Sequence, residues 1–284
     1  MPFRASLAGD GGKPFPAPLP AGLAGGGMNP QGATLFLAAH PDDEYYCAAT
    51  LYHLARHLAA PVDQMVITDG AGGHRFAGLA GAVYGLDLSE GGKDHGLLPV
   101  IRREESQRAS RLLGLRETIF LGQPDPGFTL DAAAAEHCWD LGWLERRLLE
   151  RLLDQDYAAL FVIAPEDQEH GHHKAVCRLA QKVLALLPAQ RRPVLVGAQP
   201  GHSARGPACR PPAFQFSRSR PVPGAESLTY SVIVNWLIAE YKSQGLFQLE
   251  AGRHDCERFW ILPPSDDRVS SAFLDQLALY PQAA

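Results

Sequence analysis

The chain has 284 residues, 46% of them hydrophobic, which is enough to build a core in one large domain or two small ones. Its 26 basic and 31 acidic residues give a net charge of −5, and the basic residues are scattered, which argues against a nucleic-acid-binding protein. The sequence has no apolar run near the roughly 18 residues of a membrane span, and because residues 1–30 contain no apolar h-region we do not expect them to be a secretory signal. Its five widely spaced cysteines form no CxxC pair, and we expect reduced thiols in a cytoplasmic protein.

The first 30 residues differ in composition from the rest of the chain. Residues 1–30 are rich in Gly, Pro and Ala and show no apolar period, so we expect a flexible N-terminal extension. Met28 is a candidate start, because sequence typical of ordered structure begins just after it. Residues 31–284 are then expected to form a single domain.

From Ala33 onward, short apolar runs typical of buried strands alternate with segments of helical spacing. We expect strands at 33–39, 62–70, 117–122, 157–165, 193–199 and 227–234. We expect helices at 46–58, 101–115, 136–153 and 235–246. A further helix is expected to begin in the segment after the fourth strand and to end at about residue 187. Long loops are expected at 71–99, which is Gly-rich, and at 200–226, which is rich in Pro, Arg and Ser. This alternation predicts an α/β fold with a mostly parallel sheet and helices on both faces, so that ligands bind at the carboxyl ends of the strands.

A histidine and three acids follow the first predicted strand directly, in the stretch LFLAAHPDDEYYCA at 35–48. One explanation is a helix start, with Pro41 in the first turn and Asp42 as an N-cap worth about 1 kcal/mol. This explanation accounts for one or two acids but not for His40. The alternative is a divalent-metal site, because His40 and Asp43 have a spacing that can point both side chains to one side. A metal lowers the pKa of a bound water, and the neighbouring Asp42 carboxylate could accept its proton.

The segment EHGHH at 169–173 places three histidines directly after the fourth predicted strand, at the same edge of the sheet. A solvated, histidine-rich helix start is the simpler explanation. However, a metal site begun by His40 and Asp43 needs a third ligand from another strand end, and this segment is the best supplier. His170 and His173 are three residues apart and share a helix face, so one could bind metal while the other, protonated, stabilises an oxyanion or donates a proton.

Other polar residues give weaker signals. Asp69, in a TDG turn, is expected to serve the turn, with a role beside the metal ligands as the alternative. Arg102, Arg103, Glu104 and Glu105 begin a predicted helix and are expected to form a solvated face. Nucleophile elbows and phosphate-binding loops are absent from the sequence.

Several of these motifs occur together in one known family. AHPDDE after the first strand, TDG after the second, IRREESQRASRLLG, a later His-x-x-His pair and a C-terminal YKSQ resemble the PIG-L/LmbE-like zinc N-deacetylases, over roughly residues 33–250. The resemblance implies a Rossmann-like three-layer α/β domain, extending over 31–284 with a loop-rich C-terminal region. It implies an enzyme that removes an acyl group, usually acetyl, from the nitrogen of an amino sugar.

The resemblance also implies roles for individual residues. His40, Asp43 and His173 would bind Zn²⁺, although a His₂Asp site also suits other divalent metals. Asp42 would be the general base, His170 would stabilise the oxyanion, and Arg102 would contact substrate. The expected partner is a small N-acyl amino-sugar substrate, with no nucleic acid and no membrane span.

One position departs from the family pattern. The second motif is usually His-x-Asp-His, whereas this chain has His172 in place of the aspartate. The missing carboxylate would orient the adjacent histidine or keep it protonated. Without it, the protonated form of His170 is expected to be less stabilised. Two alternatives therefore stay open: an amidase acting on a thiol or antibiotic conjugate, and a catalytically weakened binding protein of the same fold.

Overall fold

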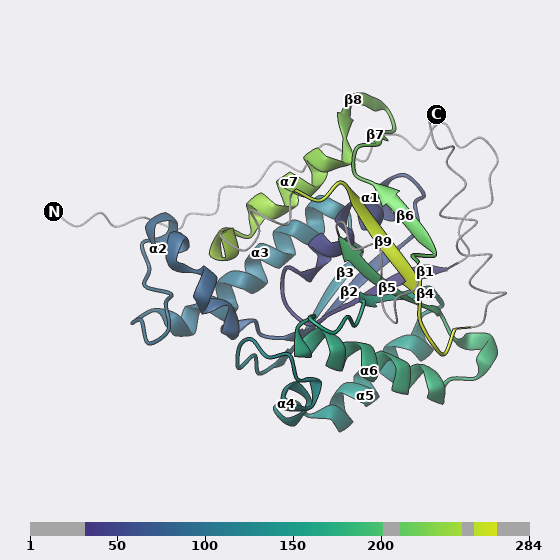
Figure 1. The fold of residues 1–284 in the computed structure, drawn as a ribbon, viewed down its shortest axis with the longest axis horizontal. Helices are drawn as coiled ribbons and strands as arrows, with labels where there is room; N and C mark the ends of the chain where they lie inside the picture. Colours follow the sequence, from purple (N-terminus) through teal and green to yellow (C-terminus); the bar gives the residue numbers. More distant parts are fainter. Residues whose placement is uncertain (1–31, 201–210, 246–252, 266–284) are drawn as a thin grey trace.

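The structure is a computed structural model that describes residues 32–200, 211–245 and 253–265. Its centre is a seven-stranded sheet in the order β3-β2-β1-β4-β5-β9-β6 (Figure 1). The strands are β1 (Ala33–Ala38), β2 (Val62–Thr68), β3 (Glu117–Gln123), β4 (Tyr157–Ile163), β5 (Val194–Pro200), β6 (Phe214–Ser217) and β9 (Cys256–Ile261). Strands β1 to β5 are parallel, and β9 runs antiparallel to both β5 and β6. The predicted α/β fold with a mostly parallel sheet is confirmed.

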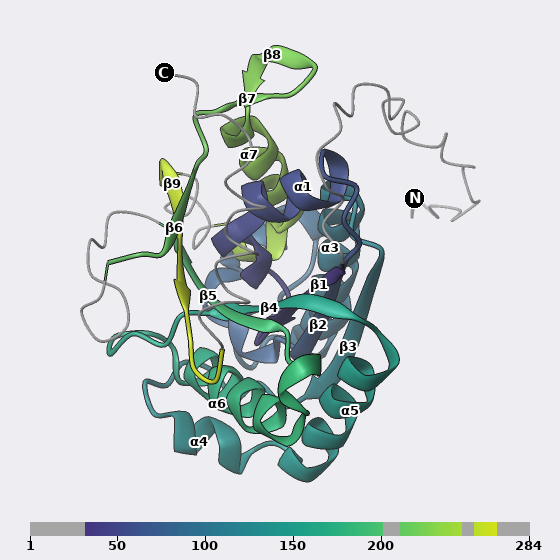
Figure 2. The ribbon, with the colours of Figure 1, turned by 90° about the vertical axis from the view of Figure 1, so that its right-hand side faces the viewer.

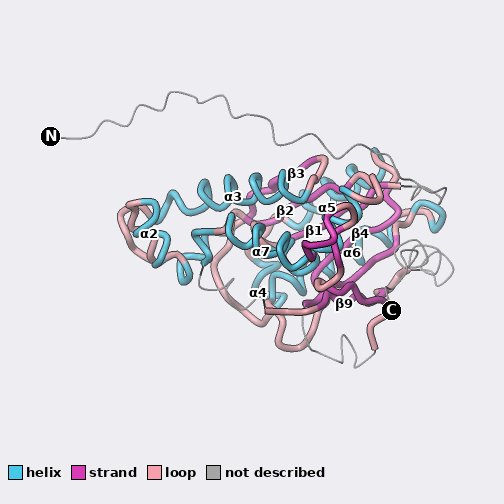
Figure 3. The backbone as a smooth tube through the Cα atoms, turned by 90° about the horizontal axis from the view of Figure 1, so that it is seen from above, coloured by secondary structure: helices cyan, strands magenta, loops and turns pink. Residues whose placement is uncertain are grey.

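Helices cover both faces of this sheet, as Figures 1 and 2 show. One layer contains α1 (Ala48–Arg56), α3 (Leu98–Leu113) and α7 (Tyr230–Glu240). The other contains α4 (Ala132–His137), α5 (Leu141–Asp154) and α6 (Gly171–Leu186). Seen from above, α2 (Gly78–Tyr84) lies at one end of the molecule, away from the strands (Figure 3).

The first strand explains why the sheet takes helices on both faces. Its residues are all buried, and alternate side chains point to opposite sides. Phe36 packs in the core formed with α1, α3 and α7, whereas Leu35 and Leu37 pack in the core formed with α4, α5 and α6. A continuous apolar strand therefore forms the middle of a three-layer sandwich.

Several expected boundaries were wrong. The expected loop 71–99 contains α2 and the short 3₁₀ helices η2 (Ala71–Phe76) and η3 (His95–Leu97), and the expected helix 136–153 is instead α4 and α5. The described part of 200–226 contains β6 and the hairpin strands β7 (Pro221–Val222) and β8 (Ala225–Thr229). The expected strand 227–234 is largely the start of α7, because the apolar residues Tyr230, Ile233, Val234 and Leu237 follow a helical period. The 1–30 extension lies outside the described residues.

Within the described ranges, no helix is both long and apolar enough to cross a membrane. The carboxyl ends of the parallel strands share one edge of the sheet, and the segments that follow β1 to β4 meet there. The amino ends share the opposite edge. We refer to these as the carboxyl edge and the amino edge.

Candidate active site

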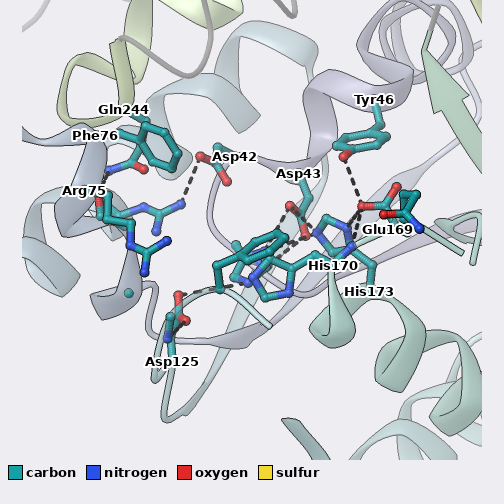
Figure 4. A pocket seen from close by; sticks show the side chains of 17 residues that line it. Asp42, Asp43, Tyr46, Arg75, Phe76, Asp125, Glu169, His170, His173 and Gln244 are labelled. Carbon is teal, nitrogen blue, oxygen red and sulfur yellow. Dashed lines mark hydrogen bonds and ion pairs between the residues drawn. The ribbon is translucent and has the colours of Figure 1, made fainter. Parts of the chain in front are cut away.

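A cavity of about 260 Å³ lies at the carboxyl edge (Figure 4). Its walls come from the segments that follow four parallel strands, together with Gln244 from the short 3₁₀ helix η6 (Lys242–Gln244). All six residues to which the sequence assigned a role line this cavity, namely His40, Asp42, Asp43, Arg102, His170 and His173. The chain thus brings together groups that are up to 133 residues apart in the sequence.

Asp43 fixes the turn that follows β1. Its Oδ2 accepts hydrogen bonds from the backbone N–H groups of Ala39 at 2.7 Å and His40 at 2.8 Å. The other oxygen, Oδ1, is thereby directed toward His40 and His173. One carboxylate therefore holds the backbone with one oxygen and presents the other to the site.

Three potential ligand atoms form a nearly equilateral triangle. Asp43 Oδ1 lies 3.3 Å from His40 Nδ1 and 3.1 Å from His173 Nε2, and the two nitrogens are 3.2 Å apart. Tetrahedral zinc with bonds of about 2.0–2.1 Å holds its ligand atoms about 3.3–3.4 Å apart. The three side chains are buried, and two imidazoles with one carboxylate are suitable ligands for zinc. The donor set therefore fits a zinc ion.

Asp43 and His173 shift each other's pKa in the metal-free protein. Burial lowers the pKa of His173, but the carboxylates of Asp43 and Glu169 outweigh it and raise the value to about 10. Burial raises the pKa of Asp43, but His173 and His40 outweigh it and hold the value well below its usual range. A bound cation would replace the proton on His173.

Asp42 occupies a strained backbone position beside the triangle. Its φ of 138° and ψ of −13° are unusual for any residue with a side chain. It stands at the N-cap position of η1 (Asp43–Cys47), but its side chain makes no capping hydrogen bond, so the helix-cap explanation was wrong. Instead, its Oδ2 lies 2.9 Å from Nη2 of Arg102. Burial, assisted by the neighbouring Asp43 carboxylate, raises the pKa of Asp42 to about 6 against the pull of Arg102.

Arg102 is buried, which corrects the expectation that it belongs to a solvated face. Its Nη1 donates to Gly70 O at 2.6 Å and its Nη2 donates to Pro41 O at 3.0 Å. Gly70 has a φ of +74°, and a Cβ there would lie 2.8 Å from Arg102 Nη1, so the TDG turn requires glycine. Arg102 thus ties the β1 and β2 loops together beneath Asp42.

Glu105 is fully buried as well, which also contradicts the solvated-face expectation, while Arg103 and Glu104 are exposed. Its carboxylate accepts hydrogen bonds from the backbone N–H of Ser243 at 2.9 Å and from Tyr84 Oη at 2.8 Å. Glu105 therefore links α3 to the YKSQ segment and positions the neighbouring Gln244 at the cavity.

The start of α6 positions the three histidines of the segment EHGHH. His170 is the N-cap residue, and its Nδ1 accepts a hydrogen bond from the backbone N–H of His172 at 3.0 Å. Gly171 packs so closely that a Cβ would lie 2.5 Å from Asp131 O. Burial and the neighbouring His40 and His173 lower the pKa of His170 to about 2. His170 is therefore neutral, with its remaining proton on Nε2, and not protonated as the residue pattern alone indicated.

His173 has a second partner that sequence reasoning missed. Its Nδ1 lies 2.7 Å from Glu169 Oε1, and Tyr46 and Gln199 also contact this carboxylate. In Figure 4, His173 lies between Asp43 on one side and Glu169 on the other. Carboxylates commonly hold metal-binding imidazoles in this way. The four-residue spacing between Glu169 and His173 was the available signal.

Asp125 was also missed, although it follows β3 at the carboxyl edge within the PDPG turn. Its Oδ1 lies 3.7 Å from His172 Nδ1, and its Oδ2 lies 4.0 Å from His40 Nε2. The position of the turn at the same sheet edge was the signal. Asp69, by contrast, accepts a hydrogen bond from the backbone N–H of Ala71 at 3.0 Å, as expected for a turn residue.

Comparisons with known proteins bear on both the fold and the family. A search of curated sequences gives no significant match. The solved N,N'-diacetylchitobiose deacetylase from Pyrococcus horikoshii aligns with a TM-score of 0.52 at 17% identity, covering 81% of this chain and 84% of that chain. A deacetylase of teicoplanin biosynthesis aligns at 0.53 and 15% identity, covering 82% of this chain and 100% of that chain.

A third solved structure has a different activity. The 4-carboxy-2-hydroxymuconate hydratase GalB from Pseudomonas putida aligns at 0.52 and 13% identity, covering 83% of this chain and 98% of that chain. At such identities the likeness is one of fold. The family is shown by the model described as PIG-L, GlcNAc-PI de-N-acetylase, which matches residues 35–184 and so covers more than half of the chain. The chain therefore belongs to the PIG-L family of de-N-acetylases.

Proposed function

We propose that the protein is a zinc-dependent hydrolase that removes an acetyl or similar acyl group from the nitrogen of an amino sugar or its small conjugate. The observation that carries the proposal is the triangle of His40 Nδ1, Asp43 Oδ1 and His173 Nε2, with sides of 3.1–3.3 Å, next to the buried Asp42 carboxylate. Membership of the PIG-L family supports the same reaction.

His40, Asp43 and His173 would hold the metal. When bound, zinc would supply a Lewis acid that lowers the pKa of a water and polarises the acyl oxygen. A site with these protein ligands leaves space on the cavity side for water and substrate. Glu169 holds His173 in the orientation that directs its Nε2 toward the other two ligands.

Asp42 and His170 would manage the proton and the developing negative charge. A carboxylate with a pKa of about 6 is ionised at neutral pH and basic enough to accept a proton from the attacking water. His170 would donate a hydrogen bond from Nε2 to the acyl oxygen as that oxygen becomes negative. As the amide C–N bond breaks, the proton held by Asp42 would pass to the departing amine nitrogen, which leaves acetate and an amine.

The cavity suits a small, partly apolar substrate. Its volume of about 260 Å³ is close to the lower end of the range for small-ligand pockets. The rings of Tyr46, Phe76 and Phe128 contribute to its walls and could pack against the faces of a sugar, while Arg102 would contact polar substrate groups.

The test is metal analysis of the purified protein combined with an assay of amine release from N-acetylglucosamine conjugates. Asp42→Asn should keep its zinc and lose about 10²–10⁴-fold in turnover, because only the proton acceptor is removed. Arg103→Gln, at an exposed position on the same helix as Arg102, is the control and should have unchanged activity. Undiminished amine release by Asp42→Asn would refute the assignment of the base, and a wild-type protein that binds no metal would refute the proposed function.

A further inference from the structure

His172 lies in a buried position behind the proposed metal site. Its side chain is completely inaccessible to solvent. Its Nδ1 lies 2.8 Å from Nε2 of His40, and its ring is 5.3 Å from the ring of Trp139. His172 is the residue at which this chain departs from its family pattern. Its side-chain hydrogen bond goes to His40, while its ring also packs beside that of His170, with the ring centres 4.5 Å apart.

We propose that His172 is a positioning residue that accepts the Nε2–H of His40 and thereby holds Nδ1 of His40 toward the metal. This inference rests on the proposed function, because it takes His40 to be a ligand. It assigns the residue that replaces the usual aspartate a role in metal affinity.

The proton positions follow from the contacts of the two rings. His40 Nδ1 is the atom in the ligand triangle, so it must present a lone pair when metal is bound. A neutral imidazole then carries its proton on Nε2, which faces His172 Nδ1 at hydrogen-bond distance. The Nδ1 atom of His172 must therefore be the acceptor, and His172 carries its own proton on Nε2.

The surroundings of His172 hold its ring in place without a second hydrogen bond from any described residue to the side chain. Its Nε2 is buried and has no hydrogen-bond partner among the described residues, so the tautomer is set by the contact at Nδ1 alone. The Trp139 ring near His172 provides an aromatic environment. The backbone N–H of His172 donates to His170 Nδ1, which fixes the position of His172 at the start of α6.

Asp125 is the competing acceptor for the His40 proton, but it is placed less well. Its nearer oxygen is 4.0 Å from His40 Nε2, beyond hydrogen-bond distance, whereas His172 Nδ1 is at 2.8 Å. Metal-binding histidines usually donate their other N–H to a carboxylate, a carbonyl or a water, and loss of that partner typically costs 10–100-fold in metal affinity. In this chain a neutral imidazole serves as the partner.

A matched pair of variants separates the hydrogen bond from the packing. His172→Asn places its amide oxygen close to the position of Nδ1, and His172→Leu has the same branched shape without an acceptor. Zinc affinity is measured by competition with a chelator at constant pH, and the melting temperature of each metal-free variant reports its folding. We expect His172→Leu to lose about 10–100-fold in zinc affinity and His172→Asn to recover most of that loss.

The outcomes distinguish this inference from the proposed function. If wild-type protein binds zinc and the two variants have equal affinities, the positioning role is wrong and the proposed function stands. Two zinc ions bound to the wild type and one to His172→Leu would also overturn it, because His40, His170 and His172 would then form a second metal site. A wild-type protein that binds no zinc would refute both proposals.

Discussion

The two edges of the sheet each bury an aspartate beside an arginine, but they use the pair differently. At the amino edge, Asp63 accepts hydrogen bonds from Arg116 Nε at 2.9 Å, Arg151 Nη2 at 2.7 Å and Tyr157 Oη at 2.6 Å. At the carboxyl edge, Asp42 pairs with Arg102 at 2.9 Å and lines the cavity from a strained backbone position.

The pKa values of the two aspartates move in opposite directions. Burial raises the pKa of Asp63, but the hydrogen bonds from Arg116, Tyr157 and Arg151 outweigh it and lower the value. Burial dominates at Asp42 and raises the pKa to about 6. At the amino edge, the carboxylate of Asp63 has its hydrogen bonds filled and contributes to stability. At the carboxyl edge, the carboxylate of Asp42 stays basic enough to take up a proton. Groups arranged for chemistry are commonly less satisfied than groups arranged for stability.

The largest expected effect is at the carboxyl edge, in Asp43→Asn. This change removes the charge of a proposed ligand, so zinc affinity should fall by more than the roughly 10–100-fold cost of losing a partner of a ligand. Competition with a chelator measures the affinity. Glu104→Gln, at an exposed position on α3, is the control and should bind zinc like the wild type. Zinc affinity of Asp43→Asn within a few-fold of wild type would contradict the ligand assignment.

The next largest effect is the release of a proton from the carboxyl edge when zinc binds. His173 has a pKa of about 10 in the metal-free protein, so at neutral pH zinc must displace its proton to bind. Because acid favours the metal-free form, zinc affinity should fall about tenfold for each unit that the pH is lowered below 10, per proton released. Calorimetric titrations in two buffers of different ionisation enthalpy count the protons. Identical heats in both buffers would contradict the prediction.

Much of the fold could be predicted because the strands carry their own signal. The continuous apolar run at 33–39 indicated a strand buried on both faces, and the structure shows helices on both sides of β1. The strand β9 was not predicted, because Cys256–Ile261 is short, shows no regular alternation of polar and apolar residues, and lies after the regular strand–helix pattern. The expected strand at 227–234 was wrong because β-branched residues such as Ile233 and Val234 also suit the buried face of a helix.

The candidate site could be predicted in part, for a physical reason. His40, Asp43 and His173 each follow a strand, and parallel strands bring their carboxyl ends together. Glu169, which holds His173, and Asp125, which lies beside His40 and His172, come from segments that looked like ordinary helix-start and turn sequences. The tautomer of His170 also depends on a backbone N–H that only the folded helix start provides. Supporting contacts of this kind require the three-dimensional structure.

The smallest expected effect is at the amino edge, in Asp63→Asn. This variant leaves Arg151 and Tyr157 without their charged partner and should lower the free energy of unfolding by about 1–3 kcal/mol. Zinc affinity and turnover should remain unchanged, because the carboxyl edge is intact. Asp154→Asn, at an exposed position on α5, is the control and should change stability by less than about 0.5 kcal/mol. Urea unfolding of the three proteins at pH 7 measures the differences.

The pH dependence of unfolding tests whether Asp63 stabilises the amino edge through its charge. The pKa of Asp63 is lower in the folded chain than the value of about 3.9 in an unfolded chain. Its contribution to stability is therefore fully present above pH 4 and is lost as the pH falls through the folded pKa. The difference in unfolding free energy between wild type and Asp63→Asn should thus shrink when the pH is lowered from 5 to 3. A difference that stayed constant over this range would show that Asp63 acts through packing rather than through its charge.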